Sequence, residues 1–279
     1  MAEQDAVVDN RVAAVVIMAA GAGTRMRSAI PKVLHRIAGK SLVALAIDTA
    51  DALAPERLVV VVGHQREQVT AHLAEVAPHV TIAVQEQQLG TGDAVRAGLA
   101  ALSDVSGAVV VTSGDVPLLS GETLQELVAT HRVEGNAVTV LTAIVPDPTG
   151  YGRVVREGDH VARIVEQKDA APEELDLSEI NSGIYVFESD VLAAGIATLE
   201  AKNAQGELYL TDVVAHARAS GRRVGAQLLA DYLQTEGVND RIQLAERGAE
   251  LNRRILHRWM AEGVTVIDPA TTWVQAGVD

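Results

Sequence analysis

Residues 12–32 read VAAVVIMAAGAGTRMRSAIPK, an apolar run followed by a loop that contains glycines, two arginines and a lysine. The apolar part is short, valine-rich and almost continuous, which is typical of a strand buried on both faces of a parallel sheet. In such sheets ligands bind beyond the carboxyl ends of the strands, where this loop begins. The stretch therefore predicts an α/β fold and the place in that fold where a ligand site should lie.

The rest of the first half repeats short apolar strands separated by helical patterns. This alternation predicts right-handed βαβ units and a Rossmann-like, doubly wound, mostly parallel sheet. The expected strands are 12–18, 58–62, 80–84, 108–112 and 137–141, and the expected helices are 41–53, 65–76, 92–102 and 121–134. From about Pro146 the chain becomes turn-rich, and strands are expected at 153–155, 161–166 and 184–187. The longest helical pattern covers 240–262, and the segment VTVIDPATTWV after it reads as a strand or turn.

Composition excludes several classes of protein. The chain has 279 residues, no cysteine and a formal net charge of −14. The absence of cysteine excludes disulfides, thiolate metal sites and a cysteine nucleophile, and the acidic charge argues against a nucleic-acid or anionic-membrane surface. No apolar run is long enough to cross a bilayer, and residues 1–10 lack the features of a signal peptide. We therefore expect a cytoplasmic protein with a disordered tail over residues 1–10.

The loop after the first strand resembles a dinucleotide-binding turn but departs from it. Gly21 and Gly23 are present, whereas Met26 occupies the third glycine position of that fingerprint. Arg25 and Lys32 lie in or after the loop, and such cations, with glycine N–H groups, favour a more anionic ligand than NAD. The alternative is a solvated basic turn. A second loop, Gly39-Lys40-Ser41, resembles the end of a Walker A motif but lacks its first glycine, so capping of the next helix by Ser41 explains it better.

Other polar residues follow later strands. Asp115 comes directly after the strand at 108–112, a usual position for a carboxylate that holds Mg²⁺ between phosphates, although Ser113-Gly114-Asp115 also reads as a plain turn. The loop 85–92 could read the edge of a base or could simply precede the next helix. Asn239 offers a neutral oxygen to a metal at Asp115, or alternatively an N-cap for the long helix.

The second half carries residues suited to a sugar. Gly152, Glu166 and Asn181 lie on loops or strand ends, and carboxylate and carboxamide groups offer directional bonds to hydroxyl and amide groups. Each of the three taken alone is more often structural. The eight histidines show no metal-binding spacing, and no Gly-x-Ser-x-Gly elbow occurs.

Taken in order, the motifs AAGAGTRM, PKVLH, LGTG, GDVPL, GYGR, VEQKDA, NSGIY, NAQGELYLTD and GVN resemble bacterial N-acetylglucosamine-1-phosphate uridylyltransferases, the amino-terminal half of the bifunctional enzyme GlmU. The resemblance runs from about Val12 to the end of the chain. It implies the nucleotide-diphospho-sugar transferase fold with a long C-terminal helix, and Mg²⁺-dependent uridylyl transfer from UTP to N-acetylglucosamine 1-phosphate for cell-wall precursor synthesis.

The resemblance also implies roles for individual residues. Binding of UTP falls to Ala20, Gly21, Gly23, Arg25, Lys32, Gln85, Gly90 and Thr91, with Arg25 and Lys32 also catalytic. Asp115 is implied as catalytic and, with Asn239, as a metal ligand. Gly152, Glu166, Asn181 and Asn239 are implied to bind the sugar phosphate.

This sequence departs from the family at a few positions. Ala22 and Asp93 stand where the family usually has lysine or proline and histidine, and Asn239-Asp240 replaces an Asn-Asn pair. The hexapeptide-repeat β-helix of the bifunctional enzyme is absent, so we expect no acetyltransferase activity and, because that domain forms the trimer, a monomer. The expected organisation is a transferase domain at 11–239, with a nucleotide part to about 145 and a sugar part from 146, a connecting helix at 240–262, and the start of a missing domain at 263–279.

Two other functions remain open at this stage. A thymidylyl- or uridylyltransferase acting on glucose 1-phosphate shares the opening motif, but the sugar-side motifs disfavour it. A non-catalytic nucleotide-sugar-binding module is a different class, and the presence of Arg25, Lys32 and Asp115 together argues against it.

Overall fold

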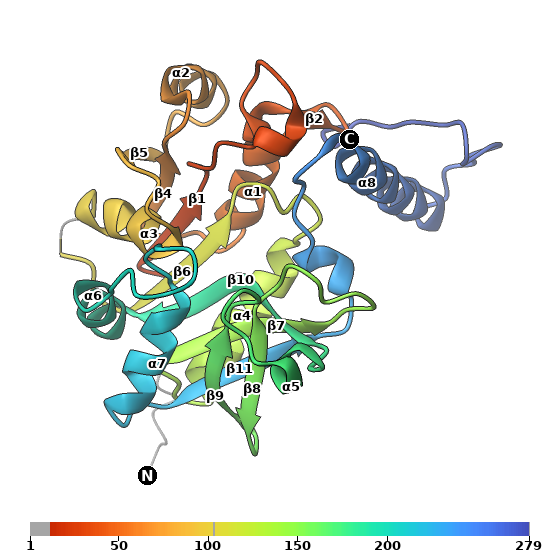
Figure 1. Ribbon diagram of the computed structural model, residues 1–279. Helices are drawn as coiled ribbons and strands as arrows, with labels where there is room; N and C mark the ends of the chain where they lie inside the picture. Colours follow the sequence, from red (N-terminus) through yellow and green to blue (C-terminus); the bar gives the residue numbers. More distant parts are fainter. Residues whose placement is uncertain (1–11, 103, 279) are drawn as a thin grey trace, which may run out of the picture.

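The computed structural model describes residues 12–102 and 104–278 (Figure 1). Within these residues, nine strands form one sheet in the order β11-β7-β10-β6-β1-β4-β5, with β8 paired to β10 and β9 paired to β8. The strands of this sheet are β1 Ala14–Met18, β4 Arg57–Val62, β5 Thr81–Val84, β6 Ala108–Ser113, β7 Val138–Ile144, β8 Arg153–Glu157, β9 His160–Val165, β10 Glu179–Glu188 and β11 Val224–Leu229. A separate small hairpin joins β2 Arg36–Ile37 to β3 Lys40–Ser41.

The parallel core of the sheet is made of the valine-rich runs. Val16 of β1 pairs in register with Val59 of β4 and Val111 of β6, and all three side chains are fully buried. Burial on both faces explains why these strands read as continuous apolar runs rather than alternating ones. The five strands expected in the first half are confirmed to within a few residues at their ends.

Strand β10 departs from the parallel pattern. It lies between β6 and β7 and runs antiparallel to both, so the sheet is mixed. It covers ten residues rather than the four expected at 184–187, and its register with β7 shifts between Asn181 and Tyr185. The register shift and Gly183, at φ 79°, explain why the sequence resembles a turn at this point. Because β10 runs in the opposite direction, its first residues lie at the edge where the parallel strands end.

Helices cover both faces of the sheet (Figure 1). Side chains of α1, α2 and α4 pack with Val15, Ile17 and Val60, while α3, α6 and α7 pack on the opposite face with Val16 and Val59. The helices are α1 Leu42–Asp51, α2 Arg66–Val76, α3 Thr91–Ala100, α4 Gly121–Val133, α5 Pro172–Leu175, α6 Ser189–Ala197, α7 Thr211–Ala219 and α8 Arg241–Ala261, with short 3-10 turns at η1 Thr24–Met26, η2 Lys32–Leu34 and η3 Tyr232–Thr235. The expected cap of α1 is confirmed, since the Ser41 hydroxyl accepts from the Ala44 N–H at 3.2 Å.

Helix α8 lies at one side of the molecule (Figure 1). Leu244 and Leu251 pack against a small cluster that includes Met26 and Leu42. The residues after α8, 263–278, form turns and irregular backbone without a strand, so the turn reading of this segment is the correct one. None of the described helices is long and apolar enough to span a bilayer.

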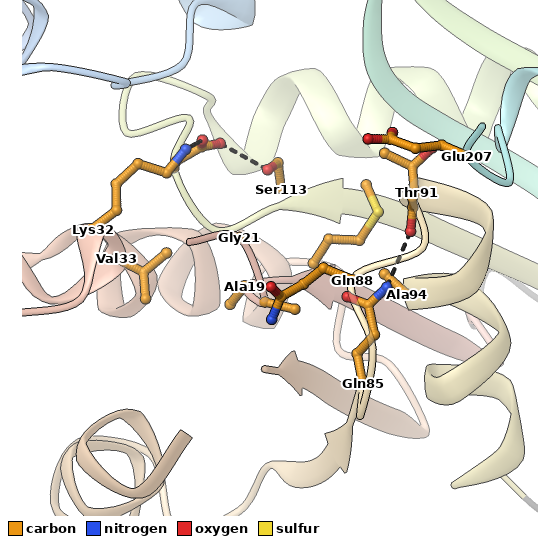
Figure 2. Close-up of a pocket in the computed structure, with 14 residues that line it drawn as sticks. Ala19, Gly21, Lys32, Val33, Gln85, Gln88, Thr91, Ala94, Ser113 and Glu207 are labelled. Carbon is orange, nitrogen blue, oxygen red and sulfur yellow. Dashed lines mark hydrogen bonds and ion pairs between the residues drawn. The ribbon is translucent and has the colours of Figure 1, made fainter. Parts of the chain in front are cut away.

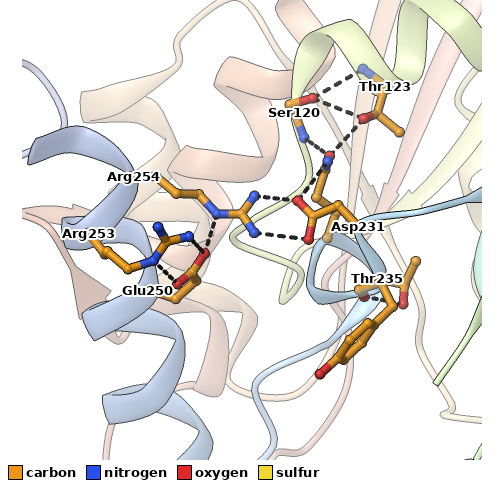
Figure 3. A network of polar contacts seen from close by, with 9 residues as sticks. Ser120, Thr123, Asp231, Thr235, Glu250, Arg253 and Arg254 are labelled. Atoms are coloured by element: carbon orange, nitrogen blue, oxygen red, sulfur yellow. Dashed lines mark hydrogen bonds and ion pairs between the residues drawn. The ribbon is translucent and has the colours of Figure 1, made fainter. Parts of the chain in front are cut away.

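A polar network fastens α8 to the domain (Figure 3). Glu250 accepts from both Arg253 and Arg254, and Arg254 also pairs with Asp231 at 2.8 Å. Gln234 of η3 continues the network, because its amide oxygen accepts from the Ser120 N–H at the start of α4. The middle of α8 is therefore joined to η3 and, through Gln234, to the start of α4.

Candidate active site

A cavity of about 260 Å³ opens at the carboxyl ends of the parallel strands (Figure 2). Seven of the residues that the sequence singled out line it: Ala20, Gly21, Lys32, Gln85, Gly90, Thr91 and Asp115. They come from the loops after β1, β5 and β6, as expected for a ligand site in a sheet of this kind.

Lys32 and Asp115 form the charged end of this cavity. The Lys32 ammonium donates to Asp115 Oδ2 in an ion pair whose side chains are 13% and 15% exposed, and it also donates to Asn239 Oδ1 at 3.3 Å. Ser113 donates its hydroxyl to Asp115 Oδ1 at 2.7 Å. Lys32 is therefore in direct contact with both Asp115 and Asn239, the two residues expected to bind a metal.

Backbone contacts bring Asn239 to this position. The Val238 N–H donates to the Asp115 carbonyl at 2.8 Å, and the Asn239 N–H donates to Gln243 Oε1 at 2.8 Å. Asp240, not Asn239, caps α8, because its carboxylate accepts from the Gln243 N–H. Capping occupies the Asp240 side chain, while the Asn239 amide oxygen accepts from Lys32.

The residues of the glycine-rich loop differ in where they lie. Gly23 adopts φ 59°, and a Cβ there would lie 2.6 Å from Lys32 Cβ, so this glycine lets the loop pass closely over Lys32. Met26, at the third glycine position of the dinucleotide fingerprint, is a core side chain at 1% exposure. Arg25 is exposed on η1 and does not line the cavity, so the structure brings Gly23 but not Arg25 to the Lys32 cluster.

Gln85, Gly90 and Thr91 form the opposite wall. The Gln85 amide nitrogen donates to the Gly90 carbonyl at 3.1 Å and to Asp93 Oδ2 at 2.8 Å. Gly90 has φ 113°, and a Cβ there would lie 2.6 Å from the Leu208 carbonyl oxygen. The Thr91 hydroxyl accepts from the Leu210 N–H at 3.1 Å, which joins this loop to the segment 203–212.

Of the four residues expected to bind the sugar phosphate, Gly152, Glu166 and Asn181 come together, whereas Asn239 lies beside Lys32. The Asn181 N–H donates to the Gly152 carbonyl at 2.9 Å, and a Cβ on Gly152 would lie 3.4 Å from Glu166 Oε2. Glu166 lines a second cavity of about 520 Å³, together with Asp169, Tyr209, Thr211 and other residues. Tyr151, beside Gly152, lies close enough to Asp115 for the carboxylate to raise its pKa, after the larger effect of burial.

Glu166 has an unusual electrostatic environment. Burial raises the pKa of its carboxyl group above the ordinary range, and the charges of Asp169, Asp212 and Glu207 act in the same direction. The Thr211 hydroxyl, 3.5 Å from Glu166 Oε1, opposes the shift. A ligand that donates a hydrogen bond to this carboxylate would stabilise its charged form.

The segment 203–212 borders both cavities. Glu207 lines the first, and Tyr209 and Thr211 line the second. The motif NAQGELYLTD stands out in the sequence, but the sequence does not indicate that Glu207 lines the first cavity. Nor does it indicate that Ser113 contacts Asp115 or that Asp93 contacts Gln85. Asp93 could have been found from its position two residues after Thr91, which the sequence had already singled out.

A sheet of this topology, with a lysine beside a strand-end carboxylate, has its cavity where ligands bind in α/β sheets and a cation suited to phosphate groups. The chain belongs to the nucleotidyl transferase family, whose model matches residues 14–266. Among its relatives, the "Bifunctional protein GlmU" of Cutibacterium acnes is 57% identical over 274 residues, which are 96% of this chain and 66% of the relative. The protein of the same name in Streptomyces avermitilis is 57% identical over 271 residues, 96% of this chain and 56% of the relative. The chain thus spans between half and two thirds of the length of these relatives.

Two solved structures share the fold. A UDP-glucose pyrophosphorylase complexed with UDP-glucose aligns with a TM-score of 0.66 and 17% identity, covering 87% of this chain and 99% of its own. The inositol-1-phosphate CTP transferase from T. maritima aligns with a TM-score of 0.64 and 16% identity, covering 91% and 98%. The predicted α/β, mostly parallel architecture with a long C-terminal helix is confirmed.

Proposed function

We propose that this chain transfers the uridylyl group of UTP to N-acetylglucosamine 1-phosphate, giving UDP-N-acetylglucosamine and pyrophosphate for cell-wall precursor synthesis. The observation that supports it most strongly is the segment 203–212, which forms a wall of both the Lys32–Asp115 cavity and the Glu166 cavity. The two cavities are therefore neighbours, as the binding sites of two substrates that react with each other must be. The relatives named GlmU support the same reaction.

On this proposal UTP binds in the Lys32–Asp115 cavity, and the sugar phosphate binds next to it at residues of which only Glu166 lines the second cavity. Ala20, Gly21 and Gly23 admit the triphosphate, and Gln85, Gly90 and Thr91 contact uracil. Gly152, Glu166, Asn181 and Asn239 hold the sugar phosphate. The nucleotide part of the domain would then end near residue 145 and the sugar part would follow it to 239.

The reaction is a single in-line displacement. An oxygen of the sugar phosphate attacks the α-phosphorus of UTP, a new P–O bond forms, and the bond from the α-phosphorus to the bridging oxygen breaks to release pyrophosphate. The nucleophile is already an anion, so no general base is required, and catalysis consists of alignment and charge neutralisation. Lys32 would neutralise the leaving group from within the cavity, and Arg25 would join it from the loop when the triphosphate is bound.

Residues for a Mg²⁺ ion fit this chemistry. The Lys32 ammonium lies in contact with both Asp115 and Asn239, so these oxygens already receive a cation. One carboxylate and one neutral oxygen, completed by substrate phosphates, is a donor set that Mg²⁺ accepts. When bound by Asp115 and Asn239, the ion would offset the negative charge of the two phosphates that approach each other.

Pyrophosphate release across a small panel of substrates tests the proposal. UTP with N-acetylglucosamine 1-phosphate and Mg²⁺ should give the highest rate, and chelation of the metal should abolish it. A higher rate with glucose 1-phosphate, or with TTP, would instead assign another sugar-1-phosphate nucleotidyltransferase. Binding of UTP and UDP-N-acetylglucosamine without turnover of any pair would assign a non-catalytic module.

Two further expectations belong to this proposal. We infer that the substrates are the chain's partners, that it acts in the cytoplasm, and that it is monomeric by itself. Light scattering at micromolar concentration measures the last of these, and a mass of two or three chains would contradict it.

A further inference from the structure

Gln85 is a buried polar side chain in the wall of the first cavity. It directly follows β5, its N–H donates to the Val62 carbonyl at 2.8 Å, and the residue is 5% exposed. It nevertheless lines the cavity. Its terminal amide can therefore meet a ligand only in the orientation that its protein neighbours allow.

Those neighbours fix which end of the amide is nitrogen. The Nε2 group lies 3.1 Å from the Gly90 carbonyl and 2.8 Å from Asp93 Oδ2. A carbonyl and a carboxylate only accept hydrogen bonds, so both amide protons are used. Rotating the amide by half a turn would place its oxygen against two other oxygens.

The carboxylate of Asp93 is itself held on both sides. Asp93 is 6% exposed, and its Oδ1 pairs with Arg96 while its Oδ2 accepts from Gln85. It lies in the first turn of α3, where a negative charge is favourable. A carboxylate buried to this degree needs such partners, so the three side chains form one interdependent set.

The consequence is an acceptor directed into the cavity. Figure 2 shows the Gln85 amide oxygen on the side facing Gln88 and Ala19, opposite the nitrogen that bonds to Gly90. Among the described residues, no group donates a hydrogen bond to this oxygen. A ligand that meets it favourably must supply a donor.

Uracil and cytosine differ at ring atom N3. Uracil carries a donor, N3–H, between its two carbonyl groups, whereas N3 of cytosine is an acceptor. An amide free to rotate could serve either base. One held with its oxygen outward accepts from uracil N3–H and meets cytosine N3 with two opposing lone pairs.

We propose that Asp93 is a positioning residue that fixes Gln85 to accept from the base, and so makes this site select uracil nucleotides over cytosine nucleotides. The inference rests on the proposed function, because it concerns the nucleotide side of the same site. The inositol-1-phosphate CTP transferase of T. maritima has the same fold, so the choice of base would be made by side chains and not by the fold.

Substituting Asp93→Asn tests the proposal with little change in volume. Asparagine can present either an oxygen or a nitrogen to Gln85, so only the Gly90 carbonyl still holds the orientation of the amide, and its rotation becomes less costly. We expect the ratio of kcat/KM for UTP to that for CTP to fall by about tenfold or more, largely through faster use of CTP. Glu122→Gln is the matched control, since Glu122 is the first-turn acid of α4 and lies outside the cavity, and it should leave the ratio unchanged.

A second variant keeps the proposal testable if Asp93→Asn folds poorly. Arg96 is 54% exposed, and Arg96→Gln removes only the outer partner of Asp93. It should lower the same ratio in the same direction by a smaller factor. An unchanged ratio in a folded variant of Asp93, or in Arg96→Gln if no Asp93 variant folds, would overturn the proposal.

Equilibrium binding separates this proposal from the proposed function. UTP and CTP are titrated into the wild-type chain and the variants with Mg²⁺ and without sugar phosphate. A wild-type preference for UTP that Asp93→Asn reduces supports the proposal even if no uridylyl transfer is detected, which would count against the proposed function alone. Equal wild-type affinity for the two nucleotides, alongside normal turnover, would overturn the positioning role and leave the function standing.

Discussion

The Lys32 ammonium pairs with the Asp115 carboxylate, two groups 83 residues apart in the sequence, and reaches Asn239 from the same position. Lys32 follows the glycine-rich loop, Asp115 follows β6, and Asn239 precedes α8, so one cation ties three distant segments together. The lysine neutralises the carboxylate that we propose as a Mg²⁺ ligand. Substrate phosphates would offer Lys32 a new partner and leave Asp115 free for the metal.

Lys32→Ala should lower turnover by about a hundredfold or more while changing the KM for the sugar phosphate little, because the lysine acts on charge that develops on the leaving group. Steady-state pyrophosphate release measures both constants. Lys40→Ala is the control, since Lys40 is an exposed lysine paired with Asp48 and does not line the cavity. Unchanged turnover would remove Lys32 from the mechanism.

Asp115→Ala should abolish measurable activity at millimolar Mg²⁺, because the remaining Asn239 oxygen is too weak a ligand alone. Calorimetric titration of Mg²⁺ with UTP should show the matching loss of metal binding. Asp48→Asn removes an exposed carboxylate away from the cavity and should keep both properties. Retained activity in Asp115→Ala would exclude a metal role for this residue.

Glu166 predicts a pH dependence of sugar binding. Burial raises the pKa of its carboxyl group, so the group takes up a proton at a pH above the ordinary value of about 4.3. The carboxylate that would accept from sugar hydroxyls is then lost early on acidification. KM for the sugar phosphate should rise as the pH falls towards that range, while KM for UTP stays nearly constant.

Glu166→Gln separates binding from stability at this position. The folded state holds the Glu166 proton more tightly than the unfolded chain does, so ionisation above the raised pKa costs free energy of folding. The amide should therefore increase stability at neutral pH, raise KM for the sugar phosphate by about tenfold, and remove its pH dependence. A pH profile identical to that of the wild type would contradict the assignment.

Glu250 predicts the opposite sign for stability. Hydrogen bonds from Arg253 and Arg254 lower its pKa to about 2, and the side chain is 15% exposed. Its stabilising effect is fully present above the unfolded-state value near 4.3 and is lost as the pH falls through about 2. Glu250→Gln should cost about 1 kcal/mol of unfolding free energy at pH 7 and reduce the loss on acidification.

Denaturant titration at pH 7 and pH 3 measures this prediction. Glu246→Gln is a control on the same helix, because Glu246 is 54% exposed, and its effect should stay within about 0.5 kcal/mol. An equal pH dependence in the wild type and in Glu250→Gln would show that the Glu250 network does not stabilise the fold (Figure 3).

The parallel strands could be predicted because burial on both faces selects continuous apolar runs, such as the valine run of β4. Most helices could be predicted as well. The beginning of β10 could not, since Asn181 and Gly183 interrupt the apolar pattern at a register shift. Helices α6 and α7 and strand β11 were not predicted, because their short segments were not separated from the surrounding loops.

The candidate site follows a similar division. That Asp115 and Gln85 would lie at one edge follows from strand order, because each directly follows a parallel strand. The contact of Lys32 with Asn239 spans 207 residues and depends on the packing of α8, which no local pattern encodes. The bond from Gln85 to Asp93 likewise depends on how α3 begins.

The position of β10 has a consequence for dissecting this chain. Strand β10 separates β6 from β7 in the sheet, although both precede it in the sequence. A fragment ending near residue 145 would lack the strand between them, leaving β6 as an open edge and β7 detached from the sheet. The proposed nucleotide and sugar parts therefore share one sheet, and expressing either alone should yield insoluble or unfolded protein.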